Sequence, residues 1–171
     1  MTMVSRPKRS GAAKPNPALK DLEMLAGVWD VEISNAAFLP NPRASVHART
    51  SFEWIEDGAF LVIRQGSKAS GAPYSIWLIG RDEGAEDYVA LYVDDRRVSR
   101  VYQMRFRDGD WQLWRQAPGF CQRLKGVMTK DGKTINAEWE ISRDDGKTWQ
   151  HDFDLTYRRE QKRSNRGQSR R

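Results

Sequence analysis

The sequence predicts an all-β protein: a single up-and-down antiparallel β-barrel of about ten strands, with a short N-terminal helix at one end. About ten short segments alternate between apolar and polar residues, which is the pattern of strands with one buried face. Asp-Gly pairs at 108–109, 131–132 and 145–146 lie in three of the gaps and favour tight hairpins. Because a sheet of so many strands rarely stays open, we expect it to close and lose its exposed edges.

The helix is expected at the start of the folded region. Asn16 suits the N-cap, and Pro17 suits the first helical position, where a missing N–H costs nothing. Gly27 is expected to stop the helix, and Trp29 to occupy the first inward position of a strand over residues 29–33. Apolar residues recur at helical spacing between these limits, at Leu19, Leu22 and Leu25. We expect this amphipathic helix to plug one end of the barrel.

The same alternation predicts the later strands and the closure. They are expected over residues 46–54, 60–65, 74–81, 88–94, 98–106, 111–117, 120–129, 134–142 and 148–157, the last leading into Arg158 and Arg159. The last strand should return beside the first, so that Trp29, Arg158 and Arg159 close the barrel.

The charge is divided unevenly along the chain. The 171 residues carry a net charge of +6, yet residues 1–20 hold +5 and residues 158–171 hold +6, which leaves −5 for the part between them. We expect a disordered basic arm over residues 1–15, one barrel domain over 16–159, and a disordered basic tail over 160–171. Such tails could attract nucleic acid without reading its sequence, or could simply keep the domain soluble.

Cysteine and hydropathy limit the class of protein. The single cysteine, Cys121, excludes an intrachain disulfide and a cysteine-based metal site, and with two histidines a tetrahedral zinc site has little support. No signal peptide and no apolar run of about 18 residues are present. We expect a cytoplasmic protein without a membrane span, as a monomer or homodimer, with no metal.

Polar side chains on the inward face are the candidates for a ligand site. A partly apolar cavity with a few polar handles is the usual composition of a small-molecule site, and inward guanidinium groups favour an anion. The alternative is that these arginines reach the rim or pair with an acid or a carbonyl. The candidate ligand-binding residues are Arg64, Tyr92, Arg100, Tyr102, Arg115, Gln122 and His151.

His151 has three interpretations. Alternation along the last strand places it on the inward face with Phe153, Leu155 and Tyr157. It could be a hydrogen-bonded core residue, an acid or base, or an axial ligand of haem. Haem is therefore an alternative to a site without a cofactor. His47 is expected to face outward and would not join a metal site.

Two stretches resemble the calycin pattern of lipocalins and fatty-acid-binding proteins. Gly27-x-Trp29 follows a short helix, and Tyr157-Arg158-Arg159 ends the last strand. In calycins the first-strand tryptophan packs under a basic residue from the last strand. The resemblance implies the barrel and a matching role for Trp29 beneath the closing arginine.

A longer set of segments resembles a family of uncharacterised lipocalin-like bacterial proteins, over roughly residues 20–159. These segments are Ser51-Phe52-Glu53-Trp54, Gly58-Ala59-Phe60-Leu61, Arg100-Val101-Tyr102, Trp114-Arg115, Pro118-Gly119-Phe120 and residues 151–157. This likeness implies the barrel and no activity. Nitrobindins are a more distant ten-stranded relative with a haem-ligating histidine on a C-terminal strand, and His151 stands in a comparable neighbourhood.

The leading hypothesis for function is a carrier or sensor for a small anionic or amphipathic organic ligand. The second is an enzyme in the same cavity, using either haem at His151 or acid–base chemistry by His151 with Tyr102 or Tyr92. The third is nucleic-acid association through the tails. No nucleophile elbow, phosphate loop, dinucleotide fingerprint or His-Glu-x-x-His motif is present.

Overall fold

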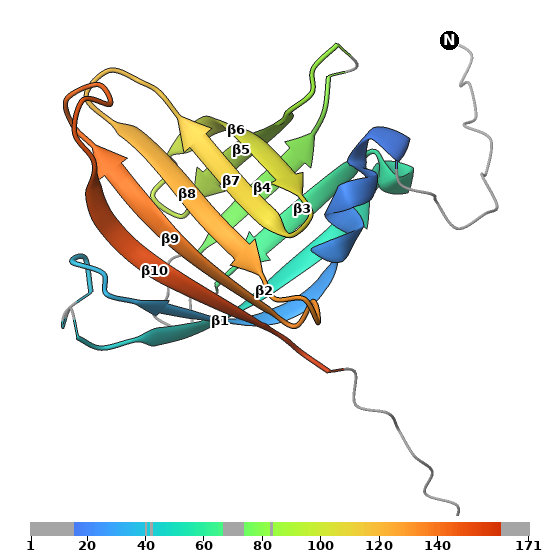
Figure 1. Cartoon of the computed structure of the whole chain (residues 1–171), viewed down its shortest axis with the longest axis horizontal. Coiled ribbons are helices and arrows are strands. Elements are labelled where there is room, and N and C mark those ends of the chain that lie inside the picture. The colour runs from blue at the N-terminus through green and yellow to red at the C-terminus, as the bar shows by residue number, and fades with distance from the viewer. Residues whose placement is uncertain (1–15, 40, 42, 67–73, 83, 162–171) are drawn as a thin grey trace, which may run out of the picture.

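The computed structural model describes residues 16–39, 41, 43–66, 74–82 and 84–161. These residues form a closed ten-stranded barrel in which each strand pairs antiparallel with its neighbours in the chain (Figure 1). The all-β barrel prediction is confirmed. The strands are β1 (Gly27–Ser34), β2 (Val46–Ile55), β3 (Phe60–Gln65), β4 (Ser75–Gly80), β5 (Tyr88–Asp94), β6 (Ser99–Arg107), β7 (Asp110–Arg115), β8 (Cys121–Met128), β9 (Thr134–Ser142) and β10 (Gln150–Arg159).

Closure is made by β1, which pairs with β2 on one side and β10 on the other. Trp29 stands opposite Arg159 in the β1–β10 register, as the sequence predicts. Arg158 points out of the barrel and donates from Nη1 to Glu32 Oε2 at 3.0 Å. Of the two expected closing arginines, Arg159 therefore contacts the barrel floor, and Arg158 forms a surface ion pair.

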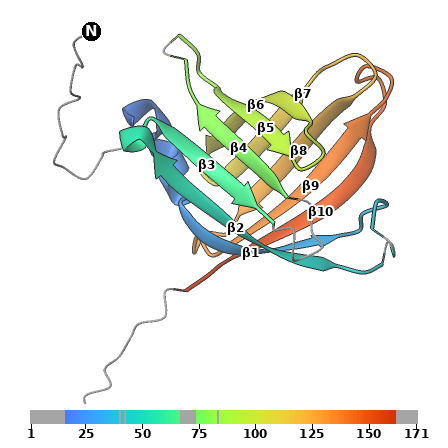
Figure 2. The ribbon, with the colours of Figure 1, turned by 180° about the vertical axis from the view of Figure 1, so that it is seen from behind.

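The helix η1 (Pro17–Met24) lies at one end of the barrel (Figures 1 and 2). It is a 3-10 helix, and Asn16 caps it by accepting from the Ala18 N–H at 3.0 Å. Leu19 and Leu22 on its inner side and Leu25 at its C-cap are fully buried and plug this end. The helix ends at Met24, earlier than the expected stop at Gly27, which already belongs to β1. Gly27 has φ +129°, and a Cβ there would lie 2.9 Å from Arg159 Nη1.

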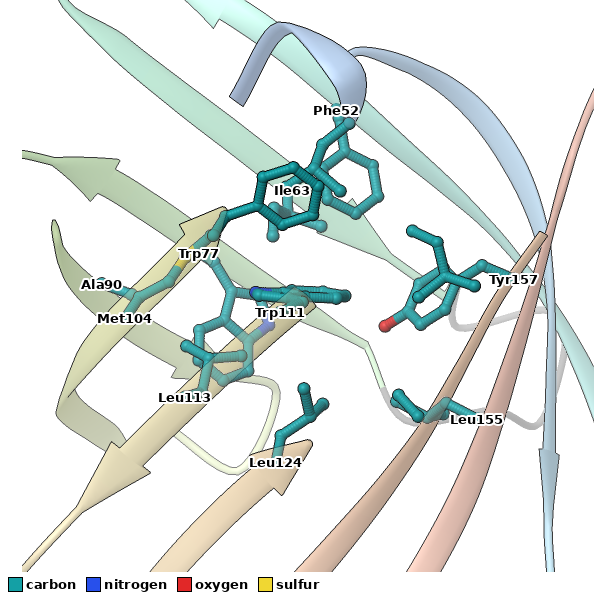
Figure 3. Packing of buried hydrophobic residues seen from close by; sticks show 14 of the residues in the cluster. Phe52, Ile63, Trp77, Ala90, Met104, Trp111, Leu113, Leu124, Leu155 and Tyr157 are labelled. Atoms are coloured by element: carbon teal, nitrogen blue, oxygen red, sulfur yellow. The ribbon is translucent and has the colours of Figure 1, made fainter. Parts of the chain in front are cut away.

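Aromatic rings fill the barrel next to η1. Trp29, Phe52, Trp111 and Tyr157 contact one another with ring centroids 5.7–6.4 Å apart, mostly edge to face. Figure 3 shows Phe52, Trp111 and Tyr157 extending inward from three different strands. A short second 3-10 turn, η2 (Glu56–Gly58), joins β2 to β3 at this end. The end beside η1 is therefore packed, and any cavity must lie toward the other end.

The face of β3 differs from the expected one. Leu61 and Ile63 belong to the core cluster, whereas Phe60 and Arg64 are exposed on the other face, where Val62 is buried but lies outside that cluster. The reason is that both faces of this strand are apolar, so alternation does not distinguish them. The outer face stays apolar across β4, β5 and β6, where the cross-strand partners of Val62 continue as Leu78, Leu91 and Val101.

The expected terminal segments are described only in part. The arm over residues 1–15 lies outside the described residues, and only 160 and 161 of the expected tail are described. Glu160 still contacts the barrel, because its N–H donates to the Val28 carbonyl at 2.8 Å and its carboxylate accepts from Arg49 at 3.0 Å. Among the described helices, none has the length and apolar character needed to cross a membrane.

Candidate functional site

A cavity of about 870 Å³ occupies the half of the barrel away from η1. It lies toward the loops that join β1 to β2, β5 to β6, β7 to β8 and β9 to β10. Its lining comes from β1, from β3 through β10 and from the four loops, which contribute Phe38, Asp95, Arg96, Phe120 and Arg143. This volume is within the range of small-molecule sites. The arrangement is therefore a barrel with one plugged end and one hollow end.

Aromatic rings form the wall of the cavity. Trp77 and Trp139 stack with centroids 6.3 Å apart and an interplanar angle of 25°, and the Tyr102 ring lies 5.2 Å from that of Trp77. Phe153 continues the wall, 6.1 Å from Trp139 and 5.3 Å from Phe38. Such a wall offers flat apolar surface suited to a ring system.

Arg100 is the cation placed in the cavity as the sequence predicts. It occupies the inward face of β6 with Tyr102, and its guanidinium carbon lies 4.4 Å from the Phe120 ring centroid and 5.8 Å from that of Tyr92. No carboxylate of the described residues lies within 4.0 Å of it. The guanidinium is therefore held by aromatic faces and lies beside the Tyr102 hydroxyl, and no described carboxylate pairs with it.

Tyr102 and Gln122 are also inside and belong to one hydrogen-bond chain. Tyr102 Oη donates to Gln122 Oε1 at 2.6 Å, and Gln122 Nε2 donates to Asp152 Oδ2 at 2.9 Å. Burial raises the pKa of the Tyr102 hydroxyl, although the nearby Arg100 and Arg115 oppose this shift. Tyr102 is thus a neutral donor at physiological pH, and the carboxylate fixes the orientation of the amide.

Tyr92 lines the mouth of the cavity and binds a carboxylate of its own strand. Its hydroxyl donates to Asp94 Oδ2 at 2.9 Å, and Arg96 donates to the same oxygen. Burial of Asp94 acts to raise its pKa, but hydrogen bonds from Arg96, Tyr92 and the Val98 N–H outweigh it and hold the pKa at about 2. Asp94 is therefore charged and already neutralised by Arg96.

The formal charges of the lining cancel. Three arginines and three aspartates line the cavity: Arg96, Arg100, Arg143, Asp94, Asp95 and Asp152. Net charge therefore does not select an anion. Within this balanced lining, Arg100 is a cation of the aromatic region without a described acid as partner.

Arg115 lies beside the cavity rather than in its lining. Its Nη1 donates to the Phe120 carbonyl at 2.7 Å, and its guanidinium carbon lies 5.6 Å from the Phe120 ring centroid. It matches the alternative considered for an inward arginine, namely pairing with a carbonyl. Its contact fixes Phe120, against which Arg100 packs.

Arg64 and His151 are outside the cavity, so their expected inward orientation is wrong. Arg64 is exposed on the outer face of β3. His151 is exposed on β10, and its Nε2 lies 2.8 Å from Asp154 Oδ1, which raises the pKa of the imidazole. His151 faces outward because the β9–β10 pairing shifts register between His151 and Phe153, and this shift interrupts the alternation of inward and outward side chains.

This position of His151 removes the basis for the haem and acid–base interpretations. A ring outside the barrel wall, bonded to Asp154, cannot ligate a group held in the cavity. It is also on the opposite side of the wall from Tyr92 and Tyr102, the suggested partners in acid–base chemistry. The second histidine, His47, is exposed on β2, 3.3 Å from Asp30, as expected.

Asp152, Trp77 and Trp139 are cavity residues that the candidate set omitted. The two tryptophans follow the alternation of β4 and β9, so the signal for them was present. Asp152 had no such signal, because the same irregularity that turns His151 outward places its neighbour inside. Alternation alone assigned it to the outer face.

Comparison with known proteins supports the fold and nothing finer. No protein-family model and no curated protein matches the sequence. Among solved structures, the chain is similar to Rv2717c from M. tuberculosis, with a TM-score of 0.58 and 12% sequence identity over 86% of this chain and 100% of that one. At this identity the likeness shows a shared fold alone.

Proposed function

We propose that the barrel binds a small amphipathic organic anion in its cavity, as a carrier or sensor. The apolar ring system of the ligand lies against Trp77 and Trp139, and its anionic group meets Arg100. The observation that carries the proposal is the placement of Arg100. A guanidinium packed on Phe120 and Tyr92, with no described acid within ion-pair distance, is a ready partner for a carboxylate.

The hydrogen-bond chain beside Arg100 supports a fixed orientation of the ligand. Gln122 is bound on both sides, by Tyr102 and by Asp152, so its amide does not turn to suit different ligands. Groups fixed in advance lose little conformational entropy on binding. The polar wall is therefore preorganised around the position of the anion.

The proposal is tested by three probes that share one ring system and differ in charge. Biphenyl-4-carboxylate, biphenyl-4-carboxamide and biphenyl-4-methylamine are titrated into the full chain by isothermal calorimetry. We expect the carboxylate to bind at least tenfold more tightly than the other two. The amine probe is included because three aspartates also line the cavity, and a site governed by them would prefer a cation.

Two arginine variants locate the contact. Arg100→Met should reduce carboxylate affinity to that of the carboxamide and should leave the thermal midpoint within a few degrees, since the arginine has no described acid to leave unpaired. Arg64→Met, on the outer face, is the control and should leave affinity unchanged. Tighter binding of the amine, or full carboxylate affinity in Arg100→Met, would contradict the proposal.

A further inference from the structure

We infer that the ligand also carries a hydrogen-bond acceptor at the end remote from its anionic group, and that this acceptor is received by Trp111 and Tyr157. This inference rests on the proposed function, because it concerns the deep end of the same cavity. Both side chains line the cavity, and both are only 2% exposed. Each has a polar group without a hydrogen-bond partner among the described residues.

The indole N–H of Trp111 is the first of these groups. It is buried and has no acceptor among the residues that the structure describes. Trp29, a neighbour in the same aromatic cluster, shows the usual arrangement, since its indole N–H donates to the Leu25 carbonyl at 2.9 Å. A buried donor without an acceptor is costly, and such groups in native proteins are few. The Trp111 N–H therefore lacks an acceptor among the described residues and would gain one from a ligand that reaches the floor of the cavity.

The hydroxyl of Tyr157 is the second group. The other cavity tyrosines both donate, Tyr92 to Asp94 and Tyr102 to Gln122, whereas Tyr157 donates to no group in the described part of the chain. Figure 3 shows its hydroxyl directed into the barrel interior. Burial raises the pKa of this hydroxyl, so it stays protonated and able to donate.

The two rings adjoin each other, which makes them one subsite. The centroids of Trp111 and Tyr157 are 5.7 Å apart, and the rings are inclined at 59°. Both groups donate, so the complementary ligand group is an acceptor such as a ketone or ether oxygen. A plain hydrocarbon end would leave both donors unpaired.

The position of this subsite sets the shape of the ligand. Trp111 is paired with Phe106 on β6, and Arg100 lies six residues earlier on the same strand. At about 3.3 Å per residue, Arg100 and Phe106 are roughly 20 Å apart along the strand. The side chains of Arg100 and Trp111 fill part of this distance. The ligand is therefore elongated, with an anion at one end, rings in the middle and an acceptor at the other end.

A matched pair of probes tests the acceptor. The compounds 4′-acetylbiphenyl-4-carboxylate and 4′-isopropylbiphenyl-4-carboxylate have similar shapes, and only the first has a ketone oxygen at the far end. We expect the acetyl probe to bind the full chain about tenfold more tightly than the isopropyl probe, because one net hydrogen bond changes affinity by about this factor. Tyr157→Phe should reduce that ratio at least threefold, and adding Trp111→Phe should bring it to about one.

Tyr88→Phe is the control, because Tyr88 is buried but does not line the cavity, and it should keep the full ratio. Equal affinity of the two probes for the unmodified chain would overturn the inference while leaving the proposed function in place, since both carry the carboxylate. That comparison needs no variant and stands even if Trp111→Phe fails to fold. If neither probe binds, the proposed function and this inference fail together.

Discussion

The guanidinium of Arg159 lies 4.1 Å from the centroid of the Trp29 ring, and the two residues join the end of the barrel to its beginning. Arg159 Nη1 donates to the Ala26 carbonyl at 2.7 Å and Nε to the Gly132 carbonyl at 3.0 Å, and Nη2 donates to the Met24 carbonyl. One side chain of β10 thus satisfies backbone carbonyls at the end of η1, just after η1 and in the β8–β9 turn. This contact seals the floor beneath the cavity.

Trp29→Ala should destabilise the protein by about 3–5 kcal/mol, the usual cost of removing a fully buried large aromatic side chain. The variant also loses the hydrogen bond to the Leu25 carbonyl and the edge contacts with Phe52 and Tyr157. Urea unfolding followed by circular dichroism measures the change. An unfolding midpoint equal to that of the parent chain would show that Trp29 is not part of the floor.

Arg159→Met and Arg158→Met separate the two closing arginines. Arg159→Met should cost about 1–3 kcal/mol, because backbone carbonyls around the floor lose a charged donor. Arg158→Met should cost at most about 0.5 kcal/mol, because its ion pair with Glu32 is exposed. Equal losses of unfolding free energy in the two variants would contradict the distinction.

His151 should affect stability with pH and should not affect binding. Asp154 raises the pKa of the His151 imidazole in the folded state. The stabilisation of the fold by this pair is therefore complete below the unfolded-state pKa and is lost as the pH rises through the folded-state pKa. Between about pH 6 and pH 8 the exposed pair should lose a few tenths of a kcal/mol, and His151→Gln should remove that slope. Urea unfolding at both pH values measures it.

The binding arm of the same variant uses biphenyl-4-carboxylate. Because the imidazole lies outside the barrel wall, His151→Gln should keep the parent affinity within twofold. A tenfold loss of affinity would place His151 in the site after all.

A chain trimmed to residues 15–160 should fold to the same barrel. The removed ends hold nine Lys and Arg and no acid, so the remaining chain has a net charge of −3. Glu160 is kept because it contacts Arg49 and the Val28 carbonyl. Loss of cooperative thermal unfolding in the trimmed chain would show that one of the removed ends belongs to the domain. If the trimmed and the full chain bind RNA with the same salt dependence, the tails have no role in nucleic-acid binding.

The barrel was predictable because its turns and alternation are local properties of the chain. Arg100, Tyr102 and Gln122 were found in the same way, since β6 and β8 have one polar and one apolar face. Arg64 was misplaced because β3 is apolar on both faces. His151 was misplaced because an irregularity in the pairing of two strands is set by their register, which the sequence of one strand does not display.

The indole N–H resonances give the most direct test of the central claim that the ligand binds inside the barrel. In the ¹⁵N–¹H spectrum of the full chain, titration with biphenyl-4-carboxylate should shift the resonances of Trp77 and Trp139, which line the cavity. Those of Trp54, bound to Glu23, and of Trp114, which faces Arg105 on the outer surface, should stay in place. Saturable shifts confined to Trp54 and Trp114, with Trp77 and Trp139 unmoved, would contradict the account.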